Sequence, residues 1–260
     1  MKVDVSIIMG CRGRIDHVRR ALLSYERLQH KSYEILFMDV LSKDTNLKSL
    51  YDEFEGRLPI RYVPIVEDMK QYSPETTWTG ATTWNYGIRH SEGKFVITCS
   101  GDVIISSPDM IDKFLDQYKS DRISVLTYFL SANMTRDFLF ADWVNNPDVI
   151  QTLPGFWSEV VGGATNSSRL LAGLTTYVTG QPRSMWEHMG LYRTELSHLV
   201  CDQDLVLRDV ACGRGVGTLD GCIGYHQYHP QGKYVVLSPG WTYQNEMQAR
   251  LLEPAIRDKA

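Results

Sequence analysis

The chain has 260 residues, and 43% of them are aliphatic, aromatic, methionine or cysteine, which is enough to fill the core of a folded domain. Its formal net charge of −4 argues against a generally basic nucleic-acid-binding protein, although a local group of arginines can still contact phosphate: Arg12, Arg14, Arg19 and Arg20. The five cysteines include no CxxC pair, so neither a disulfide framework nor a zinc site is indicated, and we expect a reduced, cytoplasmic setting.

Strands and helices alternate from the first residues. Apolar and β-branched runs predict strands over residues 3–9, 33–39 and 60–65, with amphipathic helices between them over residues 15–28 and 46–54. This order predicts a parallel, right-handed half-sheet of the Rossmann type. The opening residues lead directly into the first strand rather than into a signal peptide, and no stretch approaches the roughly 18 apolar residues of a membrane span.

Regular elements continue beyond residue 80, interrupted by one irregular insertion. We expect helices over residues 82–90 and 108–118, the latter with Ser107 as its N-cap, and strands over residues 94–99 and 123–130. Residues 133–168 are aromatic, rich in glycine and without clear periodicity; such a segment is either a lid or binding loop, or a surface excursion without function.

After the insertion, the pattern predicts a mixture of short strands and helices. Strands are expected over residues 174–180, 217–225 and 233–237, and helices over residues 184–189 and 202–212. No internal repeat, low-complexity segment or clear linker interrupts the chain, so we expect a single domain over residues 1–260.

Asp39 stands out because it ends the apolar run of residues 35–38 and precedes the polar residues 42–45. A carboxylate at the carboxyl end of a buried strand lies where α/β sheets bind ligands. A nucleotide or sugar-nucleotide site is therefore one hypothesis. The alternative is that Asp39 caps a turn, since aspartate is among the commonest turn residues.

Several segments in order resemble family 2 glycosyltransferases with the GT-A fold, over roughly residues 3–230. The first strand and helix match, and Thr83-Trp84-Asn85-Tyr86-Gly87-Ile88 is similar to the family's Ala-Arg-Asn-x-Gly-Ile helix. The resemblance implies an α/β fold with a mixed, mainly parallel sheet flanked by helices. It also implies a nucleotide-sugar-binding half over about residues 1–105, an acceptor half over about 106–230, and a C-terminal extension over 231–260.

The resemblance gives Asp39 the role of reading the nucleotide base, with Val40 in place of a second aspartate. Where the family carries Asp-x-Asp before its metal, this chain has Ser100-Gly101-Asp102, so Asp102 is the expected metal and diphosphate residue. The remaining residues expected at the donor are Cys11, Arg14, Asn85, Ser100 and Gly101.

A single carboxylate can serve a divalent cation if another ligand assists it, and His226 or His229 lies where the fold often supplies one. Imidazole suits manganese-like ions better than magnesium, so Mn²⁺ or Mg²⁺ is the expected cofactor, with Mn²⁺ preferred. The competing interpretation is that Asp102 forms a turn and that the two histidines are simply packed or solvated.

On the acceptor side, residues 201–205 resemble the family's Glu-Asp-x-Asp-Leu and imply Asp202 as general base, with Asp204 near the acceptor. An N-cap and a first-turn charge would explain the same two residues. Trp157, in the aromatic insertion, and Trp186 are further acceptor candidates; Trp186 either stacks on a sugar or packs in the core.

The implied function is inverting transfer of a sugar from a nucleoside diphosphate donor, most simply a UDP-sugar, to an acceptor hydroxyl. A glycan or small molecule is the first choice of acceptor, and hydroxymethylated phage DNA is another. Two alternatives stay open. A nucleotidyltransferase would normally carry a glycine-rich phosphate loop, of which Arg12-Gly13-Arg14 is a poor version. A non-catalytic nucleotide-sugar-binding protein would explain Ser100 and Val40.

Overall fold

The computed structural model describes residues 3–40, 47–65, 80–105, 107–119, 122–126, 128–129 and 178–194, with parts of 201–227. The first half contains β1 (Val5–Cys11), α1 (Ile15–Tyr25), β2 (Tyr33–Val40), α2 (Leu47–Phe54), β3 (Ile60–Ile65), α3 (Gly80–His90), β4 (Phe95–Ser100) and β5 (Val103–Ile105). Then follow α4 (Met110–Tyr118), β6 (Arg122–Leu126), β7 (Tyr128–Phe129), β8 (Val178–Pro182), α8 (Arg183–Met189), β9 (Gly215–Thr218) and β10 (Gly224–His226).

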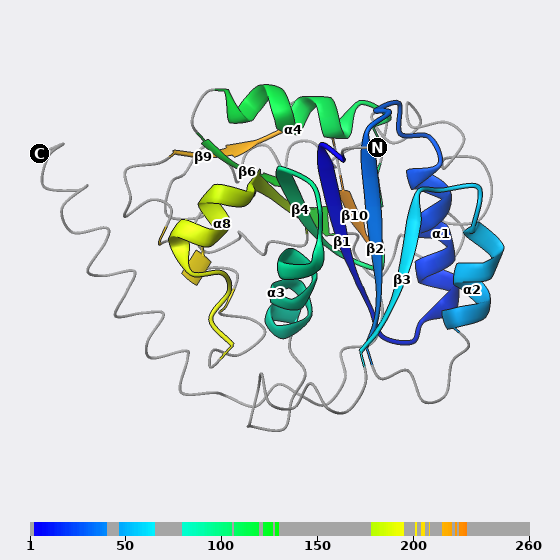
Figure 1. Ribbon diagram of the computed structural model, residues 1–260. Helices are drawn as coiled ribbons and strands as arrows, with labels where there is room; N and C mark the ends of the chain where they lie inside the picture. The colour runs from blue at the N-terminus through cyan, green and yellow to red at the C-terminus, as the bar shows by residue number, and fades with distance from the viewer. Residues whose placement is uncertain are drawn as a thin grey trace, which may run out of the picture.

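A seven-stranded sheet forms the centre of the molecule, in the order β3-β2-β1-β4-β8-β6-β9 (Figure 1). Strands β3, β2, β1 and β4 are parallel, and β8 runs antiparallel to both of its neighbours. A smaller sheet pairs β10 antiparallel to β5 and parallel to β7. The predicted α/β class, with a mixed and mainly parallel sheet flanked by helices, is therefore confirmed.

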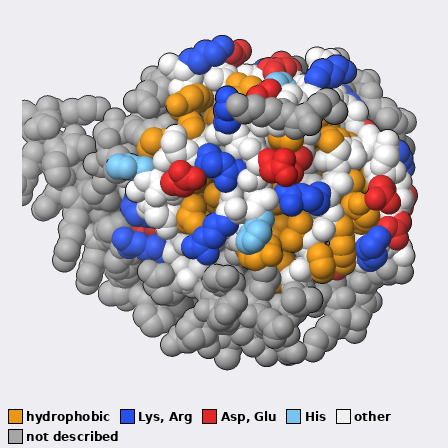
Figure 2. Space-filling view, in the orientation of Figure 1, with side chains coloured by type: hydrophobic (Ala, Val, Ile, Leu, Met, Phe, Trp, Pro, Cys, Tyr) orange, Lys and Arg blue, Asp and Glu red, His pale blue; other side chains and the backbone are white. Residues whose placement is uncertain are grey.

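The surface over the described residues mixes charges of both signs. On the face shown in Figure 2, lysine and arginine side chains lie interspersed with those of aspartate and glutamate. Of the helices in the described ranges, none has the length and apolar character needed to cross a bilayer.

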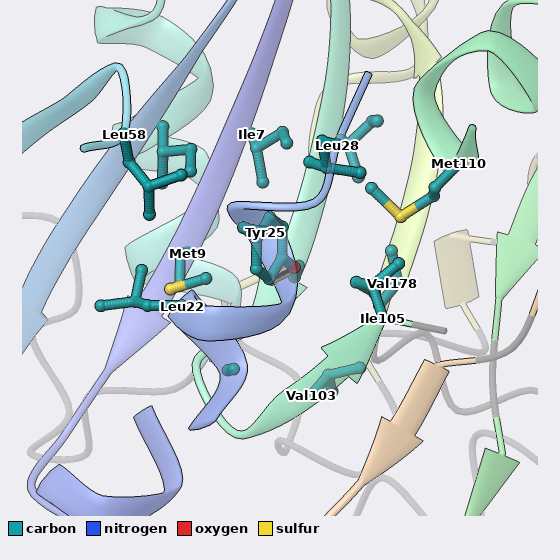
Figure 3. Packing of buried hydrophobic residues seen from close by; sticks show 14 of the residues in the cluster. Ile7, Met9, Leu22, Tyr25, Leu28, Leu58, Val103, Ile105, Met110 and Val178 are labelled. Atoms are coloured by element: carbon teal, nitrogen blue, oxygen red, sulfur yellow. Dashed lines mark hydrogen bonds between the residues drawn. The ribbon is translucent and has the colours of Figure 1, made fainter. Parts of the chain in front are cut away.

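Two apolar clusters pack on the two faces of the large sheet. Alternate residues of β1 and β2 belong to different clusters: Ile7 and Phe37 join α1, α2 and α4 in one, while Ile8 and Leu36 join α3 and α8 in the other. Figure 3 shows Tyr25 of α1 within the first cluster, close to Ile7 and Met9 of β1. The fold is therefore a sheet between two helical layers, because alternate side chains of its continuously buried central strands point to opposite faces.

The elements beyond β4 differ most from the sequence-based expectations. The single strand predicted over residues 123–130 is two strands, β6 and β7, which belong to different sheets. The strand predicted over residues 217–225 likewise divides into β9 and β10, and the three-residue strand β5 was not predicted. Such short strands are defined by their distant partners, so local periodicity does not reveal them. The strand predicted over residues 233–237 lies outside the described residues.

Helix α4 begins later than predicted. Its N-cap is Asp109 rather than Ser107. The Ser107 hydroxyl donates to the Asp109 carboxylate, whereas an N-cap hydroxyl would accept a backbone N–H of the first turn.

Helix α3 packs unusually close to β1 at Gly87. A Cβ atom placed on Gly87 would lie 2.2 Å from Cγ2 of Ile8, a fully buried side chain of β1. Glycine therefore allows the helix backbone to rest directly on the sheet, and any side chain at this position would separate the two layers.

We expect Gly87→Ala to lower the free energy of unfolding by about 1–3 kcal/mol, since overpacking at a buried contact outweighs the better helix propensity of alanine. Urea denaturation followed by circular dichroism measures the change. Gly10→Ala is the matched control, because a Cβ there would make only ordinary contacts, the nearest at 3.4 Å from Thr83. Equal stability of the two variants would contradict the proposed close packing.

Candidate functional site

The candidate site lies where the carboxyl ends of β1, β2 and β4 meet. Cys11 is paired with Asp39 across β1 and β2, and Gly10 is paired with Ser100 across β1 and β4. The chain order reverses around β1, which makes this edge the topological switch point where open α/β sheets bind ligands. The predicted residues Asp39, Ser100 and Asp102 are thus brought to one edge of the sheet.

Asp39 has one carboxylate oxygen that the protein binds and one that it does not. The Tyr62 hydroxyl on β3 donates to Asp39 Oδ2 at 2.7 Å, whereas Oδ1 is buried and has no hydrogen-bond partner among the described residues. A buried acceptor without a donor costs about 1–3 kcal/mol, and more when it is charged. Oδ1 is therefore suited to accept a hydrogen bond from a bound molecule.

Tyr62 is a site residue that the sequence analysis missed. Burial and the neighbouring Asp39 carboxylate raise the pKa of its hydroxyl well above the ordinary value, so Tyr62 remains a hydrogen-bond donor. Its ring packs against Phe37 of β2 and Tyr51 of α2, at centroid distances of 6.2 and 5.4 Å. In the register of β2 and β3, Tyr62 pairs with Phe37, two residues before Asp39, and its hydroxyl reaches the carboxylate diagonally. The sequence alone does not show this register.

Arg14 and Asp102 form an ion pair across the same edge. Arg14, the N-cap of α1, has a left-handed backbone with φ 53° and ψ 48°, and its guanidinium donates to Asp102 Oδ2. The Ser100 hydroxyl donates to the other oxygen, Asp102 Oδ1, at 2.7 Å. The Asp102 side chain is 4% exposed and that of Arg14 is 44% exposed, so the buried carboxylate holds a cation that faces solvent.

The backbone around Asp102 is fixed by its neighbours. The Gly101 N–H donates to the Gly10 carbonyl at 2.8 Å, and a Cβ on Gly101 would lie 2.6 Å from Cys11 Sγ, so only glycine fits there. Gln227, which is fully buried, donates to the Asp102 carbonyl from both its backbone and its side chain, each at 3.1 Å. Sequence reasoning selected His226 and His229 and overlooked Gln227, which lies between them.

The described residues do not fit the predicted divalent cation. Both oxygens of Asp102 accept hydrogen bonds, Oδ1 from the Ser100 hydroxyl and Oδ2 from the positively charged Arg14 guanidinium. No group of three or more His, Cys, Asp or Glu residues in the described part of the chain could hold a metal ion. The backbone of His226 pairs with Val103, next to Asp102, but its side chain and the whole of His229 lie outside what the structure describes.

Two residues predicted at the donor have their polar atoms directed into the fold instead. The Asn85 amide donates to the Tyr192 carbonyl at 2.7 Å and accepts from the Tyr192 N–H at 2.9 Å, which docks the segment after α8 onto α3. Cys11 is 2% exposed and belongs to the apolar cluster on the α1 side. Both residues are therefore buried structural contacts, and neither directs a polar atom to the edge where Asp39 and Asp102 lie.

The predicted acceptor residues are also structural where the structure describes them. Trp186 is fully buried, and its indole N–H donates to the Val96 carbonyl at 3.3 Å, which makes it a core residue. Asp204 is 1% exposed and pairs with Arg208 at 2.9 Å and Arg193 at 3.2 Å. Trp157 and Asp202 lie outside the described residues.

The N-terminal arginines do not form an open patch for nucleic acid. Arg14 pairs with Asp102, Arg19 pairs with Glu53 at 3.0 Å and with Asp16, and Arg20 donates to Gln227 at 3.1 Å. These three arginines thus lie in separate side-chain pairs rather than in one common patch, and the described residues give no support to a DNA acceptor.

Comparison with solved structures finds the same fold in known glycosyltransferases. S. aureus TarS (residues 1–349) in complex with UDP-GlcNAc is 16% identical with a TM-score of 0.64, covering 96% of this chain and 65% of that one. The mannosyltransferase PcManGT from Pyrobaculum calidifontis, in complex with GDP-Man and Mn²⁺, is 12% identical with a TM-score of 0.60, covering 99% and 65%.

These likenesses establish the GT-A glycosyltransferase fold that the sequence predicted. No family model matches the chain, and no curated protein matches its sequence. The chain spans about 65% of the length of the two structures, so their activities are not carried over by the fold itself.

The cysteine thiols near the site are expected to be unreactive. Burial raises the pKa of Cys99 to about 12 from its ordinary value of 9.0, and burial likewise raises the pKa of Cys11 well above that value. A raised thiol pKa means that the neutral, non-nucleophilic form persists at a pH where an exposed thiol is already a thiolate.

We therefore expect no rapid reaction of a Cys212→Ser variant with Ellman's reagent slightly above pH 9.0, and reaction of all remaining thiols after unfolding. The substitution removes the one cysteine outside the described residues, so the result reports on the buried ones. Rapid modification of Cys11 or Cys99 in the folded protein, identified by mass spectrometry, would contradict the account.

Proposed function

We propose that the protein transfers a sugar from a nucleoside diphosphate donor, in the simplest case a UDP-sugar, to an acceptor hydroxyl with inversion at the anomeric carbon. The observation that carries the proposal is the unpartnered Oδ1 of Asp39 at the switch point of a sheet with a glycosyltransferase fold. The likeness to proteins crystallised with UDP-GlcNAc and GDP-Man supports the donor class.

Asp39 would recognise the base. An ionised carboxylate only accepts hydrogen bonds, so it selects a base that offers an N–H in its plane, as the N3–H of uracil does. Tyr62 fixes the orientation of the carboxylate by holding Oδ2, which leaves Oδ1 for the base. Cytosine offers no ring N–H, so only its exocyclic amino group could donate to this carboxylate.

The chemical step requires a base that removes the proton of the acceptor hydroxyl. As that proton leaves, the acceptor oxygen bonds to the anomeric carbon and the bond to the diphosphate oxygen breaks, with the electron pair leaving on the nucleoside diphosphate. We propose Asp202 for this role. Its neighbours support this role by fixing the chain on both sides of it. Cys201 is buried, and Asp204 accepts a hydrogen bond from Arg208. Arg208 also donates to the Met189 and Leu191 carbonyls at the end of α8.

A nucleotidyltransferase is less well supported. Such an enzyme needs a phosphate-binding loop between its first strand and helix, but β1 ends at Cys11 and α1 begins at Ile15. For the acceptor of the sugar, we propose a glycan or a small molecule.

Asp39→Asn is expected to weaken UDP binding about tenfold to hundredfold, the usual loss when a hydrogen bond to a charged group is removed. Tyr62→Phe is expected to weaken it less, because the carboxylate remains but loses its support. Isothermal titration calorimetry measures both. Asp116→Asn, an aspartate of α4 whose side chain is 71% exposed, is the matched control. Unchanged affinity in Asp39→Asn would contradict the assignment.

Asp202→Asn is expected to reduce turnover at least about a hundredfold while leaving UDP affinity unchanged, because a general base acts on the acceptor rather than on the nucleotide. Release of UDP from a UDP-sugar panel, with glycan and small-molecule acceptors, provides the assay. UDP binding without turnover of any donor and acceptor pair would instead identify a non-catalytic nucleotide-sugar-binding protein.

A further inference from the structure

We infer that Arg14, held in place by Asp102, is the group that binds the donor diphosphate, and that nucleotide binding by this protein needs no divalent metal ion. The inference rests on the proposed function, since it concerns the same donor. It differs from the sequence-based expectation, which placed a cation on Asp102.

Both carboxylate oxygens of Asp102 are already bound within the protein. Its carboxylate is almost completely buried, with one oxygen bound by the Ser100 hydroxyl and the other by the Arg14 guanidinium. A metal ion would have to displace Arg14 from this pair and leave a cation without its partner. Breaking an ion pair whose carboxylate is buried is unfavourable, so Asp102 is poorly suited to bind a second cation.

The negative charge of Asp102 must be balanced wherever a diphosphate binds beside it. A carboxylate beside a diphosphate needs a cation between them, because like charges at close range repel each other strongly. In this protein the chain itself supplies that cation. Arg14 pairs its positive charge with the buried Asp102 carboxylate and is itself 44% exposed to solvent.

The Arg14 guanidinium has more hydrogen-bond donors than Asp102 uses. A guanidinium carries five N–H donors in a planar fork that matches phosphate oxygens. Within the described part of the chain, its side chain is hydrogen-bonded to Asp102 alone, through one nitrogen, and the side chain is 44% exposed. The other donors can therefore meet two phosphate oxygens at once.

The position of Arg14 also fits the path of a bound nucleotide. Arg14 lies in the short turn between β1, which ends at Cys11, and α1, and Asp39 is the penultimate residue of the neighbouring strand β2. Base and diphosphate contacts would therefore come from adjacent strand ends. The left-handed backbone of Arg14 is rare for a residue with a side chain and costs energy, which a purely structural N-cap would not require.

Calorimetric titration of the full chain with UDP, once in EDTA and once in Mn²⁺, tests the inference. We expect binding in EDTA, with an affinity that Mn²⁺ changes by less than about threefold. Arg14→Gln should weaken UDP binding in EDTA about tenfold to hundredfold, as expected for loss of charge-assisted hydrogen bonds, and should leave uridine binding unchanged because uridine has no phosphate.

Two further variants sharpen the test. Arg19→Gln is the matched control, since Arg19 lies on the same helix with a side chain 40% exposed and pairs with Glu53 instead. Asp102→Asn removes the predicted metal ligand but keeps the cation; we expect it to bind UDP in EDTA within about tenfold of the unsubstituted protein, because Arg14 remains charged.

Each outcome has a distinct meaning. UDP binding that appears only with Mn²⁺ and is lost in Asp102→Asn would overturn the inference and leave the proposed function intact, as would an Arg14→Gln variant with unchanged affinity in EDTA. Failure of both UDP and uridine to bind under any condition would contradict the proposed function itself. If Arg14→Gln does not fold, the comparison of EDTA with Mn²⁺ in the unsubstituted protein still decides the question.

Discussion

Strand β1 is hydrogen-bonded to a parallel partner on each side, and this double pairing determines where the candidate site lies. Because β2 and β4 both run parallel to β1, the carboxyl ends of all three strands meet at one edge. Close packing of α3 at Gly87 and of the β4–β5 turn at Gly101 keeps that edge compact. The positions of Asp39, Arg14 and Asp102 all follow from this arrangement.

Most polar groups at this edge are satisfied by other parts of the protein. Asn85 is bonded to the Tyr192 backbone, and Gln227 joins Asp102 to α1 through the His17 carbonyl at 2.8 Å. Two groups differ: Oδ1 of Asp39 has no partner among the described residues, and the Arg14 guanidinium is half exposed. Buried polar groups are almost always paired, so Asp39 Oδ1 is suited to accept a hydrogen bond from a ligand. The exposed part of Arg14 is where we propose that the diphosphate binds.

The sequence predicted the first half of the fold well because local patterns control it. The strand at residues 60–65 was placed with the bounds of β3, and β2 and α2 to within one residue. Apolar, β-branched runs mark the two strands, and helical spacing of Leu47, Leu50 and Phe54 marks α2. Strand β5 escaped prediction, and β7 and β10 were predicted only as the ends of longer strands, because two or three residues carry no period and only pairing in space defines them.

The site was predictable in part, for a similar reason. A strand-end carboxylate such as Asp39 is visible in one sequence, but its partner Tyr62 depends on strand register. The pairing of Arg14 with Asp102 joins residues 88 positions apart, so no local pattern separates an arginine-held carboxylate from a metal ligand. Trp186 has the same ambiguity, since a tryptophan fits a sugar and a core equally well until its burial is known.

A crystal structure of the full chain grown with UDP in the presence of EDTA tests the central claim most directly. We predict a nucleotide at the carboxyl edge of β1, β2 and β4, with an N–H of the base donating to Asp39 Oδ1 and the diphosphate within hydrogen-bond distance of Arg14. A nucleotide bound elsewhere on the chain, or at this edge with its phosphates directed away from Arg14, would contradict it.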